Sequence, residues 1–506
     1  MPMNFRTWEE PDPAELLLLF DDKGWENLFD RYAGELDQNI PLKRCLDVAR
    51  AAGATSVVIE TRYMDLDYRS EYSAFYSRTF EFIPDSAHRL HFFSIPLAKQ
   101  QIWSLPHDIE YLGFMVIRPS ELGPVCRTLL RPPPGLEGAT RTEVKATANL
   151  FGQDLSVRAV PFVQQDTRLG RCAHAAAWMC HYMGYLRGDV ARRTMADFSL
   201  LAEPALGMGR PLPSEGLTDR QLVELFRQFD LPCKVYSVHD LPETPDVPWT
   251  DPDPQPPAGD PPPHPGTWDT RLIRISCRYL NSGYPVLVAT KNHTFVLCGY
   301  ERERRAGQRD WITFLRHDDQ RGPYLRINDV TKDVDPGTGD VLGPWEKLIV
   351  PLPEKLWMSP ENAEIAGGRA LLEMAQHVRK GIPDAAEVFE LLATKRFALR
   401  TYARPANIFK RELEGRVDEV VLRELRLARF SRYVWVVELV DRARRERGEP
   451  CVVGEAVIDS TSSDDHPQAL AVHVPGAVWV SLTDGESRGP SRCGPDPYQS
   501  GGVGPP

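Results

Sequence analysis

The sequence predicts an α+β protein in which a helical half and an antiparallel sheet form the central part, with further α+β regions on both sides. Two patterns lead to this prediction. Apolar residues recur at helical spacing in three central segments, residues 172–186, 192–201 and 218–226. Further along, short runs rich in β-branched residues predict strands over 286–290, 294–300 and 311–316. The helical half therefore precedes the strand half along the chain.

Changes in composition divide the chain into four parts. Residues 1–140 are predicted to form an N-terminal α+β domain, which ends near the proline-rich segment 131–135. The central domain covers residues 155–355, and a second α+β domain covers 360–484. The tail, residues 485–506, is rich in Gly, Ser and Pro and is expected to be disordered.

The central domain contains a proline-rich insertion at residues 241–268. Because proline lacks a backbone N–H, such a stretch cannot form a regular hydrogen-bond ladder. We expect it to be exposed and disordered, and to separate the helical half from the strand half.

Charge and cysteine usage limit the partners and the compartment. The chain has 506 residues and a formal net charge of −11, which argues against nucleic acid as the main ligand. Its nine cysteines are scattered and form no C-x-x-C pair, as suits a reducing compartment. It shows neither a signal-peptide pattern nor an apolar run long enough to span a membrane. We expect a cytoplasmic protein without membrane or nucleic-acid partners.

A cysteine stands where the first central helix is predicted to begin. Cys172 follows the polar, glycine-containing segment 163–171 and precedes an alanine-rich helix. A helix N-terminus carries roughly half a positive charge, which favours a thiolate over a thiol. Most free cysteines are buried small hydrophobes, but this position at a helix entrance predicts that Cys172 is a nucleophile.

A histidine and an acid follow on the predicted strands. His293 opens the strand 294–300 and is predicted to be the general base. In an antiparallel hairpin, residues that face each other across the two strands have a constant sum of positions. A turn near residues 305–307 puts Asp318 or Asp319 opposite His293, and either would orient the imidazole. Counting residues from the turn does not decide between the two acids.

A glutamine precedes the cysteine, as an oxyanion site requires. Gln165 is predicted to donate its side-chain amide, together with the backbone N–H of Cys172, to the developing negative oxygen. Gln164 is the alternative, one residue further back in the loop. The order Gln, Cys, His, Asp along the chain is typical of papain-like cysteine enzymes.

Residues 160–351 resemble a papain-like cysteine peptidase of the bacteriocin-processing type, which removes double-glycine leader peptides. The matching elements are 161–165, Cys172, 182–185, 216–231, 283–286, 299–300, and Asp318 with Gly322. The spacing from Asp318 to Gly322 fits the family and favours Asp318 as the acid. The sequence departs from the family in having Ala after Cys172 and Asp319 in place of a proline.

The resemblance implies a papain-like two-lobe core and a bacterial thiol protease. Such a hydrolase would cleave a peptide or isopeptide bond in a protein or peptide substrate through a thioester. It would use a Cys-His-Asp triad and needs neither a cofactor nor a metal.

Three other interpretations fit the sequence, and the first two keep the same candidate residues. A transglutaminase-like acyl transferase shares the Cys-His-Asp order and passes the acyl group to an amine. A catalytically inactive papain-fold module would only bind protein. A zinc site would use the set Cys172, His174, Cys180 and His181. Its ligands would point apart on one continuous helix, which disfavours this site.

Overall fold

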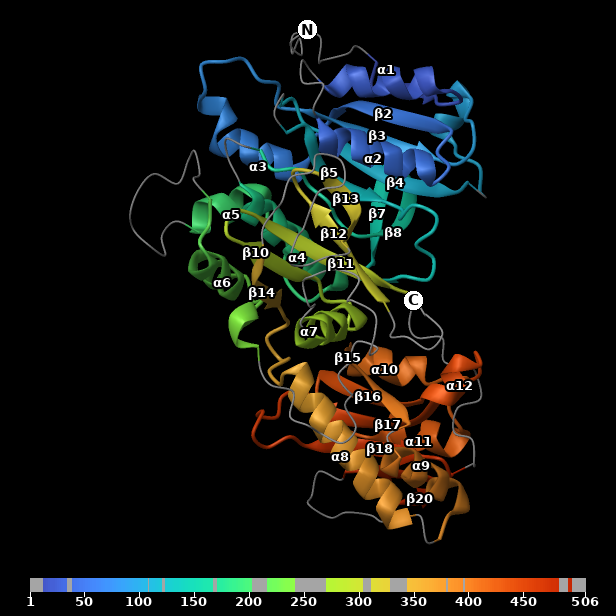
Figure 1. Cartoon of the computed structure of the whole chain (residues 1–506). Helices are drawn as coiled ribbons and strands as arrows, with labels where there is room; N and C mark the ends of the chain where they lie inside the picture. The colour runs from blue at the N-terminus through green and yellow to red at the C-terminus, as the bar shows by residue number, and fades with distance from the viewer. Residues whose placement is uncertain are drawn as a thin grey trace, which may run out of the picture. The chain divides into compact units, whose positions relative to one another are not determined.

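The computed structural model describes residues 12–33, 39–107, 109–120, 123–166, 171–202, 216–241, 270–303, 311–327, 344–378, 381–394, 396–481 and 490–493. It is an α+β protein with antiparallel sheets (Figure 1). The chain divides into two compact units. The first contains Met1–His239, Gly283–Arg305 and Asp310–Pro353, and the second contains Asp240–Ser282, Ala306–Arg309 and Glu354–Pro506. No helix among the described residues is both long and apolar enough to cross a membrane.

The first unit begins with a five-stranded antiparallel sheet in the order β1-β2-β3-β4-β5. Its strands are β1 (Ala14–Leu18), β2 (Ser56–Tyr63), β3 (Ala87–Phe93), β4 (Tyr111–Ile117) and β5 (Val125–Leu130). Every residue of β3, β4 and β5 is buried, so both faces of these strands are covered. The helices of this region are α1 (Asp22–Ala33), α2 (Ile40–Ala51) and α3 (Leu66–Ala74).

A two-stranded hairpin follows, and it packs against the first sheet. Its strands are β7 (Val144–Leu150) and β8 (Gln153–Ala159), and β8 contacts β4 and β5. Both strands alternate buried and exposed residues, as expected for a ribbon with one face on the core. The chain then leads towards the second sheet of this unit.

The second sheet carries the strand half of the central region. Its order is β13-β12-β11-β10-β14-β9, with the short β6 (Thr140–Arg141) also paired to β11. The strands are β9 (Cys233–Ser237), β10 (Val286–Thr290), β11 (Thr294–Glu303), β12 (Trp311–Asp318), β13 (Gly322–Ile327) and β14 (Trp345–Pro351). All neighbouring strands are antiparallel, as the sequence predicts.

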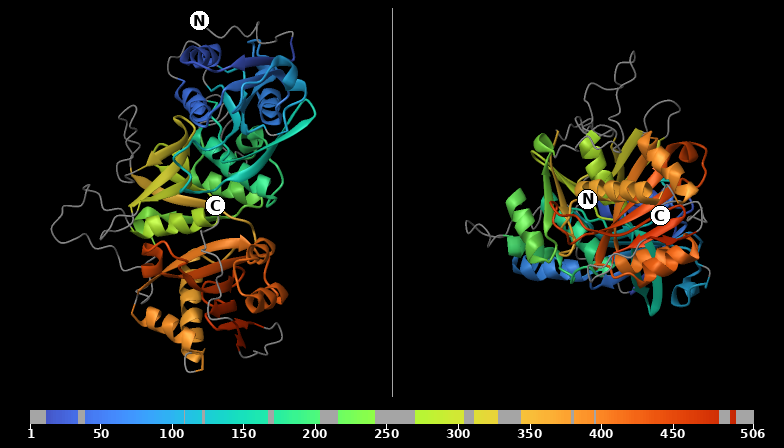
Figure 2. Two further views of the ribbon diagram at one scale, coloured as in Figure 1. Left: turned by 90° about the vertical axis from the view of Figure 1, so that its right-hand side faces the viewer. Right: turned by 90° about the horizontal axis from the view of Figure 1, so that it is seen from below.

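Three helices make up the helical half: α4 (Cys172–Arg187), α5 (Met195–Ala202) and α6 (Asp219–Gln228). Helix α4 packs against β10 and β11 (Figures 1 and 2). All its residues from Ala173 to Gly184 are buried, which explains why apolar and small residues occur around its whole circumference. The helix ends at Gly188, whose φ of 79° lies in the left-handed region that favours glycine.

The N-terminal region does not form a domain of its own. One hydrophobic core contains Phe114 of the first sheet, Trp178 of α4 and Leu315 of the second sheet. The predicted domain 1–140 therefore lies in one compact unit with most of the predicted domain 155–355. The amphipathic patterns of the sequence show that a segment has an apolar face, but they do not show which partner covers it.

The second unit is built on another antiparallel sheet, in the order β15-β16-β17-β18-β19-β20. Its strands are β15 (Phe397–Pro405), β16 (Tyr433–Asp441), β17 (Val452–Asp459), β18 (Ala469–Val474), β19 (Ala477–Val480) and β20 (Ser491–Arg492). Its helices are α7 (Thr270–Asn281), α8 (Pro360–Val378), α9 (Pro383–Ala393), α10 (Ala406–Glu412), α11 (Glu419–Leu427) and α12 (Arg442–Glu446).

Helix α8 contacts strands β15 to β18 at close range. A Cβ atom at Gly367 would lie 2.5 Å from Cβ of Val437, so only glycine fits where α8 meets β16. On the opposite side, a separate core includes Phe409 and Val421 from α10 and α11. The sheet of the second unit is therefore covered on both faces.

Two boundary predictions change with the structure. Strand β20 lies inside the tail 485–506, so a part of that tail pairs with β19 and is ordered. Helix α7 belongs to the second unit, although the sequence assigned it to the central domain. The insertion 241–268 lies outside the described residues except for Leu241.

Candidate active site

Helix α4 begins at the candidate nucleophile. Cys172 is its first residue, and the backbone N–H of Arg171 donates a hydrogen bond to Nδ1 of His174 at 3.2 Å. This bond satisfies one backbone donor of the first turn. The side chain of Cys172 is half-buried, whereas Cys180 on the same helix is buried. The thiol thus lies at the positive end of a helix and is reachable from outside.

The backbone of His293 is fixed by a tight turn between β10 and β11. The N–H of Thr290 donates to the carbonyl of His293 at 2.9 Å. The hydroxyl of Thr290 donates to the same carbonyl at 3.1 Å and accepts from the N–H of His293 at 3.2 Å. Thr290 is buried, and sequence reasoning missed it. A Thr three residues before a candidate base, across a short turn, is the signal that could have indicated it.

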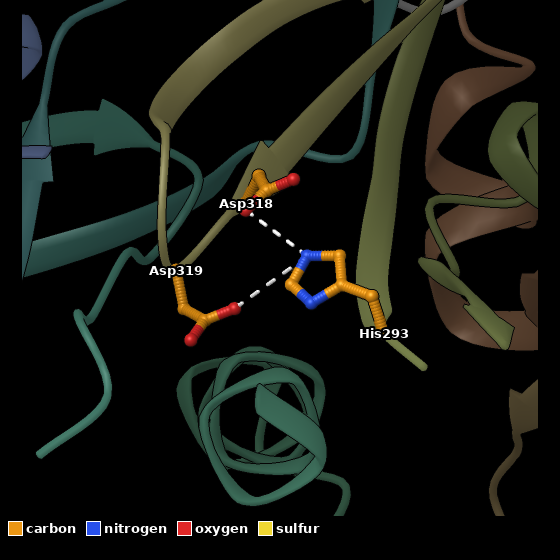
Figure 3. Close-up of side chains that lie close together, drawn as sticks. All are labelled: His293, Asp318 and Asp319. Atoms are coloured by element: carbon orange, nitrogen blue, oxygen red, sulfur yellow. Dashed lines mark ion pairs between the residues drawn. The ribbon is translucent and has the colours of Figure 1, made fainter. Parts of the chain in front are cut away.

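The imidazole of His293 faces two carboxylates (Figure 3). Its Nε2 lies 3.1 Å from Oδ1 of Asp318 and 3.9 Å from Oδ1 of Asp319. The 3.1 Å contact has an ion-pair distance, although its direction departs from that of a regular hydrogen bond. The other ring nitrogen points away from both carboxylates, towards the helix seen end-on in Figure 3. The ring also interacts with the thiol of Cys172.

The hairpin register differs from the prediction, which placed the acid directly opposite His293. In the structure Val296 pairs with His317. Continuing this ladder would put position 320 opposite His293. The pairs nearest the turn, such as Glu303 with Trp311, centre the hairpin on position 307 instead of 305–306, and a β-bulge in β11 then shifts the pairs nearer His293 back by one residue. Asp318 thus reaches His293 diagonally, from a position on the same face two residues away.

A glycine turn holds Asp318 at the end of β12. Gly322 pairs with Asp318 and has a φ of 116°, which favours glycine. A Cβ atom at Gly322 would also lie 2.5 Å from Cγ of Arg44 on α2. The backbone N–H of Gln320 donates to Oδ1 of Asp318 at 3.0 Å. The spacing from Asp318 to Gly322 therefore has a physical basis in this turn.

The charges of the site follow from burial and from the close contacts. Burial alone would lower the pKa of His293, but its contacts with Asp318 and Cys172 outweigh this and raise it to about 10. Burial would raise the pKa of Asp318, but His293 and Arg316 bring it below its usual value. Burial raises the pKa of Asp319 to about 8, opposed by His293 and reinforced by Asp318. At neutral pH the site favours an imidazolium beside an ionised Asp318.

The two candidate glutamines have different surroundings. Gln164 is buried, and its Oε1 accepts from the N–H of Val125 at 3.2 Å. Its Nε2 donates to Oδ1 of Asn39, also at 3.2 Å. Gln164 is therefore a structural residue, and the prediction that it can serve as oxyanion donor is wrong. Gln165 is half-buried and keeps this candidate role.

A buried arginine from the N-terminal region supports the segment before the nucleophile. Arg118 is fully buried and forms two hydrogen bonds to Glu71, at 2.8 and 2.9 Å. It also donates to the carbonyls of Gly123 at 2.6 Å and Gln164 at 2.7 Å. Sequence reasoning missed this residue, because no local pattern connects Arg118 with a loop some 45 positions further along.

Asp166 ties the same segment to the N-terminal region. Its carboxylate accepts a hydrogen bond from the hydroxyl of Tyr76, and both residues are buried. The candidate oxyanion residue, Gln165, therefore lies between two anchored neighbours. Residues 167–170, which connect this segment to Arg171, lie outside the described residues.

The two histidines of α4, His174 and His181, are both buried. His181 packs edge-on against Phe198 and Phe229, with ring centroids 5.5 and 5.4 Å away. Burial lowers the pKa of His174 and of His181 to about 4. Among the described residues, the one His/Cys/Asp/Glu group close enough to hold a metal is His293 with Asp318 and Asp319. The zinc set proposed on α4 is not brought together.

Comparison with known proteins adds no relative. No protein-family model matches the sequence, and no curated protein matches it significantly. Function is therefore inferred from the residues and the geometry above.

Proposed function

We propose that the protein is a cysteine-dependent hydrolase that cleaves a peptide or isopeptide bond through Cys172, His293 and Asp318. The observation that carries this proposal is the position of His293. One ring nitrogen lies 3.1 Å from a buried carboxylate, and the same ring interacts with a thiol at a helix N-terminus. Nucleophile, base and orienting acid would then act in the order that acyl transfer requires.

Before the substrate is attacked, the thiol proton of Cys172 passes to the imidazole, which gives the imidazolium that the site favours at neutral pH and leaves a thiolate. The thiolate of Cys172 attacks the carbonyl carbon of the substrate, and Asp318 stabilises the imidazolium without taking its proton. The negative oxygen of the tetrahedral intermediate accepts hydrogen bonds from the N–H of Cys172 and the amide of Gln165. His293 then gives its proton to the leaving amine as the C–N bond breaks. This leaves a thioester.

The second half of the reaction restores the enzyme. His293 removes a proton from water, and the resulting hydroxide attacks the thioester carbon. The C–S bond breaks, the acid is released, and the proton returns to Cys172 through His293. A substrate amine in place of water would give acyl transfer by the same residues.

We also propose that the central region has the papain-like two-lobe fold. The nucleophile helix α4 packs on an antiparallel sheet that carries the base and the acid, and this supports the assignment. The same arrangement supports the likeness to bacteriocin-processing peptidases over residues 160–351. All nine cysteines are free thiols, in keeping with a reducing compartment such as the cytoplasm.

Covalent labelling tests the proposal directly. We expect a peptidyl electrophile to modify wild-type protein at Cys172, as located by mass spectrometry of the digested protein. Cys172→Ala should lose the label and turnover while keeping its circular dichroism spectrum. Cys233→Ala is the matched control, because Cys233 is another half-buried thiol of the first unit, and it should label normally.

Two results would contradict the proposal. Labelling at another cysteine with full turnover of Cys172→Ala would remove the nucleophile assignment. Labelling of Cys172 without turnover of any peptide in a substrate library, with or without an added amine, would favour an inactive binding module.

A further inference from the structure

Buried polar atoms beside His293 lack regular hydrogen bonds. They are both oxygens of Asp319, Oδ2 of Asp318 and both ring nitrogens of His293. Burial of such groups without partners costs free energy, and it is rare in folded proteins. One atom of each side chain, Nε2 of His293 and an oxygen of Asp318 and of Asp319, lies in one small space, and these atom types are metal ligands once the ring nitrogen has lost its proton (Figure 3).

We propose that His293, Asp318 and Asp319 bind a Zn²⁺ ion that reversibly inhibits the enzyme. Their donor atoms all lie within 4.8 Å of one another. Tetrahedral zinc with bonds of about 2.0–2.1 Å places its donor atoms about 3.3 Å apart. The two measured separations from Nε2, 3.1 and 3.9 Å, lie on either side of that value. Small movements of the side chains would complete the three-ligand site.

The donor set selects the class of ion. One imidazole nitrogen and two carboxylates suit Zn²⁺ and similar late transition metals. Calcium prefers six to eight oxygen ligands, and magnesium keeps several water molecules. Because Asp318 and Asp319 are both buried, a site with few ligands and little water fits zinc better than either hard cation.

The inhibitory half of the inference rests on the proposed function. An ion bound to Nε2 displaces the proton from that nitrogen, and the proton leaves to solvent. The same ion binds the carboxylate of Asp318. The coordinated imidazole is then a poor acceptor for the thiol proton. The group of donor atoms close enough to share an ion does not include the thiol of Cys172, so Cys172 is not a ligand of this ion. Zinc would therefore lower the reactivity of the Cys172 thiol without binding it.

Metal binding can be measured without activity. We expect the full chain to compete with a chromogenic chelator for one equivalent of Zn²⁺. Asp319→Asn and Asp318→Asn, each checked for folding by circular dichroism, should bind zinc at least on the order of 10–100-fold more weakly. Asp154→Asn, which alters an exposed acid, and Cys172→Ala should both bind like wild type. Loss of zinc binding in Cys172→Ala, or unchanged binding in both site variants, would overturn the assignment.

Labelling with and without zinc then separates the two proposals. We expect saturating Zn²⁺ to slow electrophile labelling of wild-type Cys172 at least tenfold, and to leave the rate of Asp319→Asn unchanged relative to its own zinc-free rate. Labelling that is unaffected by bound zinc would overturn inhibition and leave the proposed function standing. Zinc binding without any labelling of Cys172 would support the metal site and contradict the hydrolase. Loss of turnover on chelation would make zinc a cofactor and overturn its inhibitory role.

Discussion

His293 and Asp318 lie diagonally across two neighbouring antiparallel strands, with Nε2 and Oδ1 3.1 Å apart. Asp319 faces the same nitrogen from 3.9 Å and lies just beyond the end of β12. The closer carboxylate accepts from the backbone N–H of Gln320, whereas neither oxygen of Asp319 has a regular hydrogen bond. Asp318 is therefore held in place as the orienting acid.

This relationship predicts different effects for the two acids. Asp318→Asn should lower turnover roughly 100-fold or more, because the imidazolium loses its ionised partner. Asp319→Asn should have a milder effect. Steady-state kinetics of the two variants on one substrate would measure the difference. If turnover is nearly lost in Asp319→Asn and nearly normal in Asp318→Asn, Asp319 and not Asp318 is the orienting acid.

Thr290 is expected to act on the position of His293. Thr290→Val keeps the β-branched shape but removes the hydroxyl that bonds to both backbone groups of His293. The loss should cost about 1 kcal/mol of stability for each bond and should slow turnover. Thr290→Ser restores the hydroxyl and should restore the rate, as kinetics and thermal melting would show. If Thr290→Val and Thr290→Ser behave alike, the hydroxyl does not position the base.

The ion pair between Arg118 and Glu71 is expected to be important for folding. Both side chains are buried, so Arg118→Met leaves an unpaired buried carboxylate and should destabilise the protein by about 3–5 kcal/mol. Arg69→Met is the control, because its pair with Asp85 is only half-buried and should contribute less than about 1 kcal/mol. Urea unfolding would compare them. Equal effects would show that the buried pair has no special role.

Acid is expected to destabilise the first unit through its buried histidines. Burial lowers the pKa of His174 and His181 to about 4 and that of His317 to about 3. In the unfolded chain they take up protons below about pH 6.5, while the folded chain stays neutral. The contribution of these three histidines to stability is therefore full above pH 6.5 and is lost towards pH 4, by about 1.4 kcal/mol per pH unit for each histidine.

A variant isolates one of these contributions. His181→Phe removes a titrating ring between two phenylalanines, so thermal unfolding should depend less steeply on pH between 6.5 and 4. His239→Gln changes an exposed histidine of the same unit and should leave the slope unchanged. Parallel slopes for His181→Phe and wild type would mean that His181 is charged in the folded protein.

The sequence by itself determined the local elements and the candidate residues of the site. Helix α4 begins at Cys172, as its apolar pattern and the preceding loop predict, and the strands around His293 follow from their β-branched residues. The spacing from Asp318 to Gly322, on which the resemblance selected Asp318, corresponds to a turn that needs a glycine. Each of these features depends on residues within a few positions of one another.

The tertiary structure decided what depends on distant contacts. The centre of the β11–β12 hairpin, together with the bulge in β11, sets a register that counting from the predicted turn does not give. Contacts with Val125 and Asn39 made Gln164 structural, and Arg118 reached the loop before Cys172 from another sheet. Burial of a side chain and its hydrogen-bond partners are set by packing between segments far apart in the chain, and a local pattern carries no information about which segments meet.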